Sequence, residues 1–209
     1  MSICEDDNIK ITLLGDSGIG KTCIIRRVTK NNFDERSNPT VGGSFASQQF
    51  NINGKLYTCD FWDTAGQEQY RSMGRIFYKD SYIVCLVYDI TREDTFKSLK
   101  NIWYPELKNY GEKYQVIAVV GNKCDLLESE KVSEDEARKF ADEIEAYYMA
   151  VSAKSGDNIQ LLFETLLKKY LGVEFVEKVS ISKKSKGRTV SINSSDHIIT
   201  KGEKKKKCC

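Results

Sequence analysis

Residues 15–22, Gly-Asp-Ser-Gly-Ile-Gly-Lys-Thr, form a glycine-rich segment with the pattern G-x-x-x-x-G-K-[ST]. Its glycines let backbone N–H groups converge on phosphate oxygens, and a helix that begins there adds partial positive charge. Lys21 can neutralise the β- and γ-phosphates of a nucleotide, and the hydroxyl of Thr22 can ligate Mg²⁺. Chance produces such a match on the order of once in a hundred comparable chains. The segment therefore predicts a site for nucleotide phosphates.

A second segment bears on the base of that nucleotide. Asn122-Lys123-Cys124-Asp125 directly follows an apolar run, and a carboxylate at Asp125 can accept two N–H donors from the N1 and N2 edge of guanine. Adenine offers no such pair of donors. Ser152-Ala153-Lys154 follows the next apolar run and fits a loop that supplies a backbone N–H to guanine O6. Although Asp125 alone could form an ordinary Asx turn, the segments together favour a guanine nucleotide.

A third segment, residues 60–68, reads Asp-Phe-Trp-Asp-Thr-Ala-Gly-Gln-Glu. A strand that ends at Asp63 would present its carboxylate to the Mg²⁺ shell through water, and Gly66 can bring its N–H close to the γ-phosphate. Gln67 can then orient a water in line with the phosphorus. A turn rich in small residues would explain the glycine but not the whole string. The segment therefore predicts hydrolysis of the γ-phosphate.

These segments must be positioned by strands and helices. Residues 9–14 are typical of a buried strand, and residues 21–30 of the helix that follows the glycine-rich turn. Residues 45–52 and 55–63 favour two strands joined by Asn53-Gly54, which suits a two-residue hairpin turn. Two continuous apolar runs, at 82–88 and 116–120, are typical of central parallel strands, and a short strand is expected at 148–151.

Three further helices are expected, at residues 93–110, 133–146 and 158–171. The second opens with the capping box Ser133-Glu134-Asp135-Glu136, and the third has one apolar stripe. Strand and helix alternate, so the predicted fold class is α/β. We expect a six-stranded, mostly parallel sheet with one antiparallel edge strand and helices on both faces. In such a sheet, ligands bind beyond the carboxyl ends of the strands.

The length of 209 residues and the content of 40% hydrophobic residues predict one globular domain, at 1–171, with a tail at 172–209. The tail has ten Lys or Arg against four Asp or Glu, whereas the net charge of the whole chain is only +2. A basic tail indicates anionic lipid, nucleic acid or another acidic surface, and its composition does not choose among them.

No run of about 18 apolar residues is present, which predicts that no segment spans a bilayer. Acidic residues at 5–7 stand where a secretory signal would be basic, so we expect no secretion. Five cysteines have neither metal-site nor disulfide spacing, which predicts buried, reduced thiols. They are Cys4, Cys23, Cys59, Cys85 and Cys124.

Over roughly residues 8–171 these motifs, with Leu-Val-Tyr-Asp-Ile-Thr at 86–91, resemble the Ras superfamily of small GTPases and, within it, the Rab branch. The resemblance implies a P-loop small GTPase fold and a switch that cycles between GTP and GDP, hydrolyses GTP and regulates vesicle traffic. One alternative is a membrane-anchored GTP-binding scaffold with negligible turnover. An ATP-using phosphotransferase is a third reading, which Asn122 and Asp125 oppose.

The resemblance also assigns roles to single residues. Gln67 and Lys21 would be catalytic, with Gln67 positioning the water. Thr22, Thr40 and Asp63 would hold Mg²⁺, and residues 33–45 and 66 to about 78 resemble the two switch segments. Phe33 would pack edge-on against the guanine. The residues that would contact GTP or GDP are Asp16, Ser17, Gly18, Ile19, Gly20, Lys21, Thr22, Cys23, Phe33, Thr40, Gly66, Asn122, Lys123, Asp125, Ser152, Ala153 and Lys154.

The sequence also departs from the family pattern. Gly43 and Ser44 stand before Phe45, where a typical Rab has an aliphatic residue and an acid. Residues 76–81 read Ile-Phe-Tyr-Lys-Asp-Ser in place of the usual stretch, and Tyr70 stands where phenylalanine is commoner. The surface that would meet effectors is therefore atypical.

The chain ends in four lysines and then Cys208 and Cys209. In a Rab-like protein this ending resembles the signal for double geranylgeranylation. Two lipid chains anchor stably at about 0.8 kcal/mol per buried CH₂, and each lysine adds about 1 kcal/mol on an anionic leaflet. The tail thus predicts a membrane partner and no nucleic acid. The resemblance implies a monomer on the cytoplasmic face of an intracellular membrane, with a cytosolic pool. Its implied partners are an exchange factor, an activating protein, a GDP-dissociation inhibitor, an escort protein and effectors.

Overall fold

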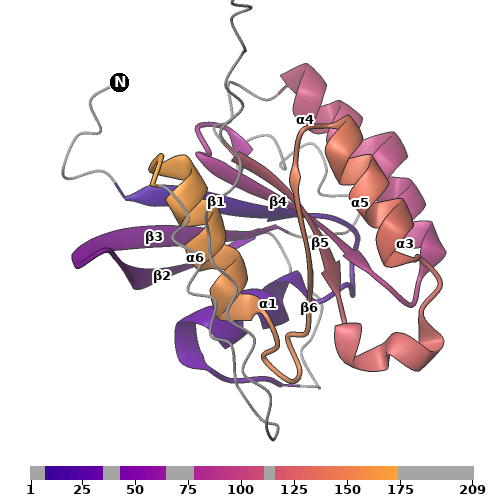
Figure 1. Cartoon of the computed structure of the whole chain (residues 1–209), viewed down its shortest axis with the longest axis horizontal. Helices are drawn as coiled ribbons and strands as arrows, with labels where there is room; N and C mark the ends of the chain where they lie inside the picture. The colour runs from indigo at the N-terminus through magenta and orange to yellow at the C-terminus, as the bar shows by residue number, and fades with distance from the viewer. Residues whose placement is uncertain (1–7, 35–42, 65–77, 111–115, 174–209) are drawn as a thin grey trace, which may run out of the picture. The chain divides into compact units, whose positions relative to one another are not determined.

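A six-stranded sheet lies at the centre of the computed structural model, which describes residues 8–34, 43–64, 78–110 and 116–173 (Figure 1). The strands lie in the order β2-β3-β1-β4-β5-β6. All neighbours are parallel except β2 and β3, which confirms the predicted fold class. The strands are β1 (Ile9–Leu14), β2 (Gly43–Ile52), β3 (Lys55–Thr64), β4 (Ile83–Asp89), β5 (Val116–Asn122) and β6 (Tyr147–Val151).

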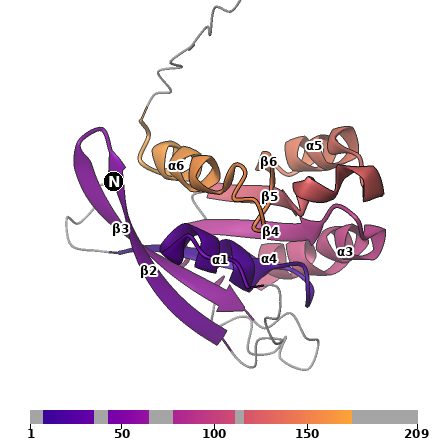
Figure 2. The same cartoon turned by 90° about the horizontal axis from the view of Figure 1, so that it is seen from below.

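The β2–β3 hairpin forms one edge of the sheet (Figure 2). Asn53 and Gly54 have φ values of 53° and 86°, as the predicted two-residue turn requires. The N–H of Gly54 also donates to the side chain of Asn51 over 2.8 Å. The hairpin begins two residues earlier than expected, because Gly43 and Ser44 already pair with Thr64 and Asp63.

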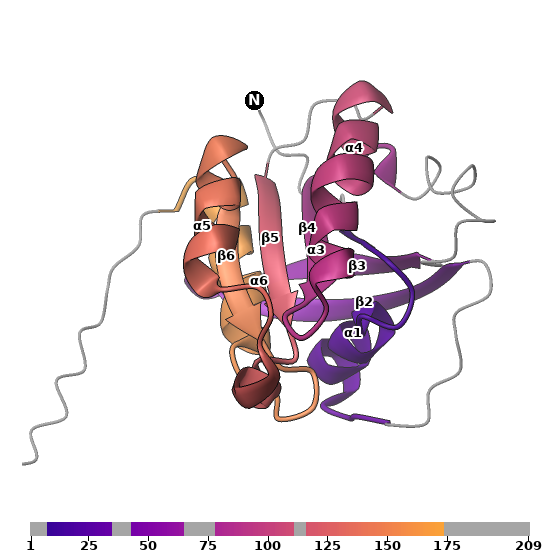
Figure 3. The same cartoon turned by 90° about the vertical axis from the view of Figure 1, so that its right-hand side faces the viewer.

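Helices cover both faces of the sheet (Figure 3). One face packs against α1 and α6, and the other against α3, η2, α4 and α5. Side chains of β4 alternate between the two: Ile83, Cys85 and Val87 join the first cluster, and Val84, Leu86 and Tyr88 the second. The helical segments are α1 (Lys21–Lys30), α3 (Glu93–Ser98), η2 (Leu99–Trp103), α4 (Tyr104–Tyr110), η3 (Cys124–Ser129), α5 (Glu134–Glu143) and α6 (Ile159–Tyr170).

The expectation of one α-helix over residues 93–110 is wrong in the middle, where η2 is a π-helix. The N–H of Tyr104 donates to the carbonyl of Leu99, five residues earlier. Pro105 follows directly, and proline has no N–H and crowds the carbonyl four residues before it. A widened turn ahead of the proline relieves that crowding.

The expected helix over 133–146 is shorter, because Glu145 has a φ of 55° and α5 ends at Glu143. Ser133 caps the helix as predicted and accepts a hydrogen bond from the N–H of Glu136 over 3.3 Å. Within the described residues, no helix has the length and apolar character needed to cross a bilayer.

The cysteines are only partly buried. Cys59 and Cys85 are buried, and burial raises the pKa of each thiol to about 12, which makes them unreactive. Cys23 and Cys124 are only half-buried, so the prediction of burial is wrong for these two. Their positions explain the difference, because Cys23 on α1 and Cys124 on η3 follow the carboxyl ends of β1 and β5, where the predicted motifs meet. Cys4 lies outside the described residues.

Candidate functional site

The glycine-rich loop between β1 and α1 packs tightly against the ends of two strands. Gly15 has a φ of 143°, and a Cβ there would lie 2.3 Å from the carbonyl oxygen of Val87. Gly20 has a φ of 95°, and a Cβ there would lie 2.4 Å from the amide nitrogen of Asn122. A larger residue fits at neither position, so these glycines are needed for both space and backbone conformation.

Lys21 is buried beneath this loop. Its ammonium group donates to the backbone carbonyls of Gly15 and Asp16, each over 2.8 Å. Burial lowers the pKa of Lys21 to about 8, while the negative charges of Asp63 and Asp16 act in the opposite direction. The loop thus folds around the side chain of Lys21, and the contact of this group with phosphate oxygens stays a prediction.

A small oxygen-rich cluster surrounds the carboxylate of Asp63, which is 1% exposed. The hydroxyl of Thr22 donates to its Oδ2 over 2.6 Å, and the hydroxyl of Ser44 donates to the same atom over 3.3 Å. Carboxylate and hydroxyl oxygens are the hard ligands that Mg²⁺ prefers, so this cluster fits the ion. The described residues contain no group of three His, Cys, Asp or Glu side chains that could hold a metal. Magnesium would therefore need ligands beyond Thr22 and Asp63.

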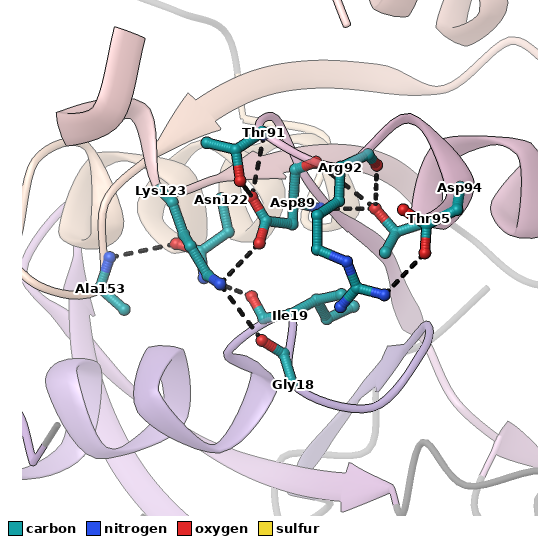
Figure 4. A network of polar contacts seen from close by, with 10 residues as sticks. All are labelled: Gly18, Ile19, Asp89, Thr91, Arg92, Asp94, Thr95, Asn122, Lys123 and Ala153. Carbon is teal, nitrogen blue, oxygen red and sulfur yellow. Dashed lines mark hydrogen bonds and ion pairs between the residues drawn. The ribbon is translucent and has the colours of Figure 1, made fainter. Parts of the chain in front are cut away.

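Asn122 joins two of the predicted segments through one buried amide (Figure 4). Its Nδ2 donates to the carbonyl of Ile19 over 2.7 Å. Its Oδ1 accepts the N–H of Ala153 over 3.2 Å. The phosphate loop and the Ser152–Lys154 loop, more than a hundred residues apart in sequence, thus lie side by side.

Lys123 bridges the phosphate loop and the end of β4 (Figure 4). Its Nζ lies 2.6 Å from Oδ2 of Asp89 and donates to the carbonyl of Gly18 over 3.3 Å. The carboxylate of Asp89 also accepts the N–H and the hydroxyl of Thr91, over 2.9 and 2.7 Å. We predicted no role for Asp89, although an acid that ends an unbroken apolar run is a usable signal.

Asp125 is oriented by Ser152. The buried hydroxyl of Ser152 donates to Oδ1 of Asp125 over 2.6 Å and accepts the N–H of Ser155 over 3.0 Å. Asp125 itself is exposed. Lys154 is exposed too. Phe33 is half-buried and packs against the core cluster beneath α1 and α6.

One predicted residue of the loop, Asp16, has a partner that we did not foresee. The carboxylate of Asp16 accepts the indole N–H of Trp103 over 2.8 Å. Gly18 has room around it, because a Cβ there would meet nothing nearer than Arg92 at 4.0 Å. Ser17 is half-buried, whereas Gly18 beside it is exposed. Thr40, Gly66, Gln67, Cys208 and Cys209 lie outside the described residues.

Comparisons with known proteins agree with this geometry. The sequence model of the Ras family matches residues 10–172. Rab-22A from Homo sapiens is 43% identical over 155 residues, covering 74% of this chain and 79% of that protein. Rab-31 from Rattus norvegicus is 40% identical over 156 residues, covering 75% and 80%. RGP2 from Oryza sativa subsp. japonica is 34% identical over 210 residues, covering 96% and 93%.

The chain therefore belongs to the Ras family of small GTPases. Within that family its relatives place it with the Rab proteins, which act in membrane traffic. It is a Rab-like small GTPase that binds guanine nucleotides and hydrolyses GTP, as predicted. The alternative of a scaffold without turnover is not favoured.

Proposed function

We propose that the phosphate loop, Asp63, Asn122–Asp125 and Ser152–Lys154 together bind GTP and GDP with Mg²⁺. The amide of Asn122 carries this proposal, because it ties the carbonyl of Ile19 to the N–H of Ala153. A nucleotide needs its phosphate site and its base site at one fixed separation, and this side chain supplies that connection. The bond of Lys123 to Gly18 adds a second tie.

Asp125 selects the base in this proposal. Its carboxylate accepts the N1 and N2 hydrogens of guanine, while Ser152 holds the carboxylate in orientation through a 2.6 Å hydrogen bond. Charge-assisted bonds of this kind are stronger than neutral ones, and adenine has no donors to form them. The backbone N–H of Ala153, which donates to Oδ1 of Asn122 over a long 3.2 Å, is shared with guanine O6 when the nucleotide is bound. Phe33 and Cys23 complete the surroundings of the nucleoside.

Lys21, Thr22 and Asp63 act at the phosphate end of the nucleotide. Lys21 places its charge against the β- and γ-phosphate oxygens, and the backbone N–H groups of Asp16 to Thr22 donate to them. Thr22, Asp63 and Thr40 hold Mg²⁺, which when bound neutralises charge that develops on the phosphate oxygens. Their hard oxygens and their closeness in the fold support this assignment for Thr22 and Asp63.

Hydrolysis and switching depend on residues outside the described ranges. Gln67 orients the attacking water, and Thr40 and Gly66 contact the γ-phosphate only in the GTP form, so that their segments relax after hydrolysis. Turnover of the chain alone is on the order of 10⁻⁴ to 10⁻³ per second, and a partner protein that inserts an arginine accelerates it.

The tail anchors the G domain to a membrane. Geranylgeranyl groups on Cys208 and Cys209, with lysines 204–207 against anionic lipid, hold the chain on the cytoplasmic face of an intracellular membrane. A GDP-dissociation inhibitor and an escort protein maintain a cytosolic pool. An exchange factor, an activating protein and effectors act on the two nucleotide states. The composition of the tail supports this arrangement.

The nucleotide that copurifies with the full chain tests the proposal. Heat extraction and chromatography should yield GDP or GTP in close to one equivalent. In competition experiments, unlabelled GDP and GTP should displace the bound nucleotide at far lower concentrations than ADP and ATP. Magnesium should slow the release of the bound nucleotide. A folded chain that prefers ATP, or that retains no guanine nucleotide in magnesium, would overturn the assignment.

A further inference from the structure

Arg27 connects α1 to the loop that follows β6. This half-buried side chain donates from Nε to the carbonyl of Ala153 over 2.9 Å and from Nη2 to the carbonyl of Lys154 over 2.6 Å. Its Nη1 donates to the backbone and side-chain oxygens of Asn31, each over 3.2 Å. One rigid guanidinium thus joins the end of α1 to two successive carbonyls of the base-site loop.

The stem of Arg27 lies against the same loop. A Cβ at Gly156, where φ is 92°, would sit 3.6 Å from Cδ of Arg27 and 3.8 Å from its Nε. The loop is closed on itself by the N–H of Gly156, which donates to the carbonyl of Ser152 over 2.8 Å. It therefore behaves as a compact turn, and Arg27 fastens that turn to the helix. The turn between β6 and α6 lies beside α1 in Figure 1.

This fastening reaches both ends of the nucleotide site. Helix α1 begins at Lys21, directly after the phosphate loop, so the helix sets where the phosphates bind. Ser152, in the fastened turn, holds Asp125 through its hydroxyl. A shift of the turn relative to α1 would therefore move Ser152 and release Asp125 from its orientation.

We infer that Arg27 is a positioning residue for guanine recognition: it fixes the Ser152–Lys154 turn against α1 and thereby holds Asp125 where it accepts the exocyclic amine of guanine. This inference rests on the proposed guanine-nucleotide site and adds a specificity role for a residue outside the set expected to contact the nucleotide. Arg26, the next residue back, provides a matched control. Its Nη1 lies 3.8 Å from Asp34, and both side chains are about half exposed, at 42% and 54%.

The test compares the release of GDP and IDP from the full chain, because inosine lacks the exocyclic amine. In Arg27→Met, GDP release should be about tenfold faster, the factor that corresponds to about 1.4 kcal/mol. IDP release should change much less, so the ratio of the IDP release rate to the GDP release rate should fall toward one. Arg26→Met should leave both rates unchanged. Arg27→Lys should fall between Met and the wild type, because lysine keeps the charge but lacks the fork that reaches two carbonyls.

Equal acceleration of GDP and IDP release would overturn the inference, because a loosened fold or phosphate site has that effect. Unchanged rates in folded Arg27→Met would overturn it as well. If Arg27→Met does not fold, Arg27→Lys provides the test. A lower ratio of IDP to GDP release rates than in the wild type supports the inference, and an unchanged ratio overturns it. Failure of the proposed guanine site itself is a separate outcome: the wild-type chain would then release GDP as fast as ADP.

Discussion

The indole N–H of Trp103 donates to the carboxylate of Asp16 over 2.8 Å, which ties the π-helix η2 to the phosphate loop. Trp103 is 3% exposed, so this bond lies at the edge of the core. The backbone carbonyl of Asp16 also accepts the ammonium group of Lys21. Asp16 is thus held from two sides, and the helical layer on one face of the sheet supports the loop expected to bind phosphate.

Replacing Trp103 by phenylalanine should speed nucleotide release. The ring still fills the core, but the charge-assisted hydrogen bond is lost, which is worth about 1 to 2 kcal/mol. We expect GDP release to accelerate by about five- to thirtyfold in displacement of a fluorescent GDP analogue. Trp62→Phe is the control, because Trp62 packs edge-on against Phe45 at 5.4 Å between ring centroids. Equal release rates in the two variants would contradict a role for Trp103.

The stability of the fold should depend on the protonation of Lys21. Burial lowers its pKa from 10.5 to about 8, so the unfolded chain holds this proton more tightly than the folded chain. Between pH 8 and 10.5 the unfolded state carries the extra proton, and the contribution of Lys21 to the free energy of unfolding rises with pH, by about 3 kcal/mol in total.

Urea unfolding of the wild type and Lys21→Met, at several pH values in this window, measures that contribution as a difference. The thiols of Cys59 and Cys85, whose pKa values burial raises, act in the opposite direction above pH 9, but they cancel between the two proteins. The wild type should gain stability relative to Lys21→Met as the pH rises. Parallel curves would show that Lys21 keeps its ordinary pKa.

Two glycines of the phosphate loop should respond very differently to alanine. Gly15→Ala forces a Cβ to 2.3 Å from the carbonyl of Val87 and should cost about 3 kcal/mol or more in unfolding free energy. Gly18→Ala meets open space and should cost about 1 kcal/mol, from its φ of 75° alone. Denaturant titration of both variants gives the comparison. Losses of similar size would mean that the loop rearranges to accommodate residue 15.

The buried carboxylate of Asp89 should contribute to stability through Lys123. Asp89→Asn removes the charge 2.6 Å from the lysine ammonium and should lower the free energy of unfolding by about 1 to 3 kcal/mol. Asp94→Asn is the control, because its pair with Arg92 is well exposed and should contribute less than about 1 kcal/mol. Chemical denaturation of the two variants should separate them clearly. Equal losses of unfolding free energy in the two variants would mean that the pair of Asp89 and Lys123 contributes no more than an exposed ion pair.

Gln67→Leu should slow hydrolysis without weakening nucleotide binding, because leucine cannot orient a water. Single-turnover phosphate release should fall by roughly ten- to a hundredfold. The matched control is Gln49→Leu, which makes the same change at an exposed position on β2. Retention of the wild-type rate by Gln67→Leu would remove this residue from the mechanism, whereas weaker GDP binding would show a structural effect instead.

Much of the fold and the nucleotide motifs could be predicted because their signals are local. Asn53-Gly54 specifies its own turn, and the P-loop glycines have spacing that few other structures need. The supporting residues could not be predicted in the same way, because each depends on a partner distant in sequence. Arg27 and Ala153 are 126 residues apart. Trp103 also needs the π-helix before Pro105, which apolar periodicity cannot distinguish from an α-helix.

The buried amide of Asn122 has a consequence for which molecules the site can hold. Because it fixes the distance between the two loops, a ligand that reaches both gains a chelate advantage: once one end is bound, the other is presented at high effective concentration. Free guanosine and pyrophosphate, added as separate fragments, forfeit that advantage. The site therefore selects its ligand by the distance between base and phosphates as well as by the chemistry of each end.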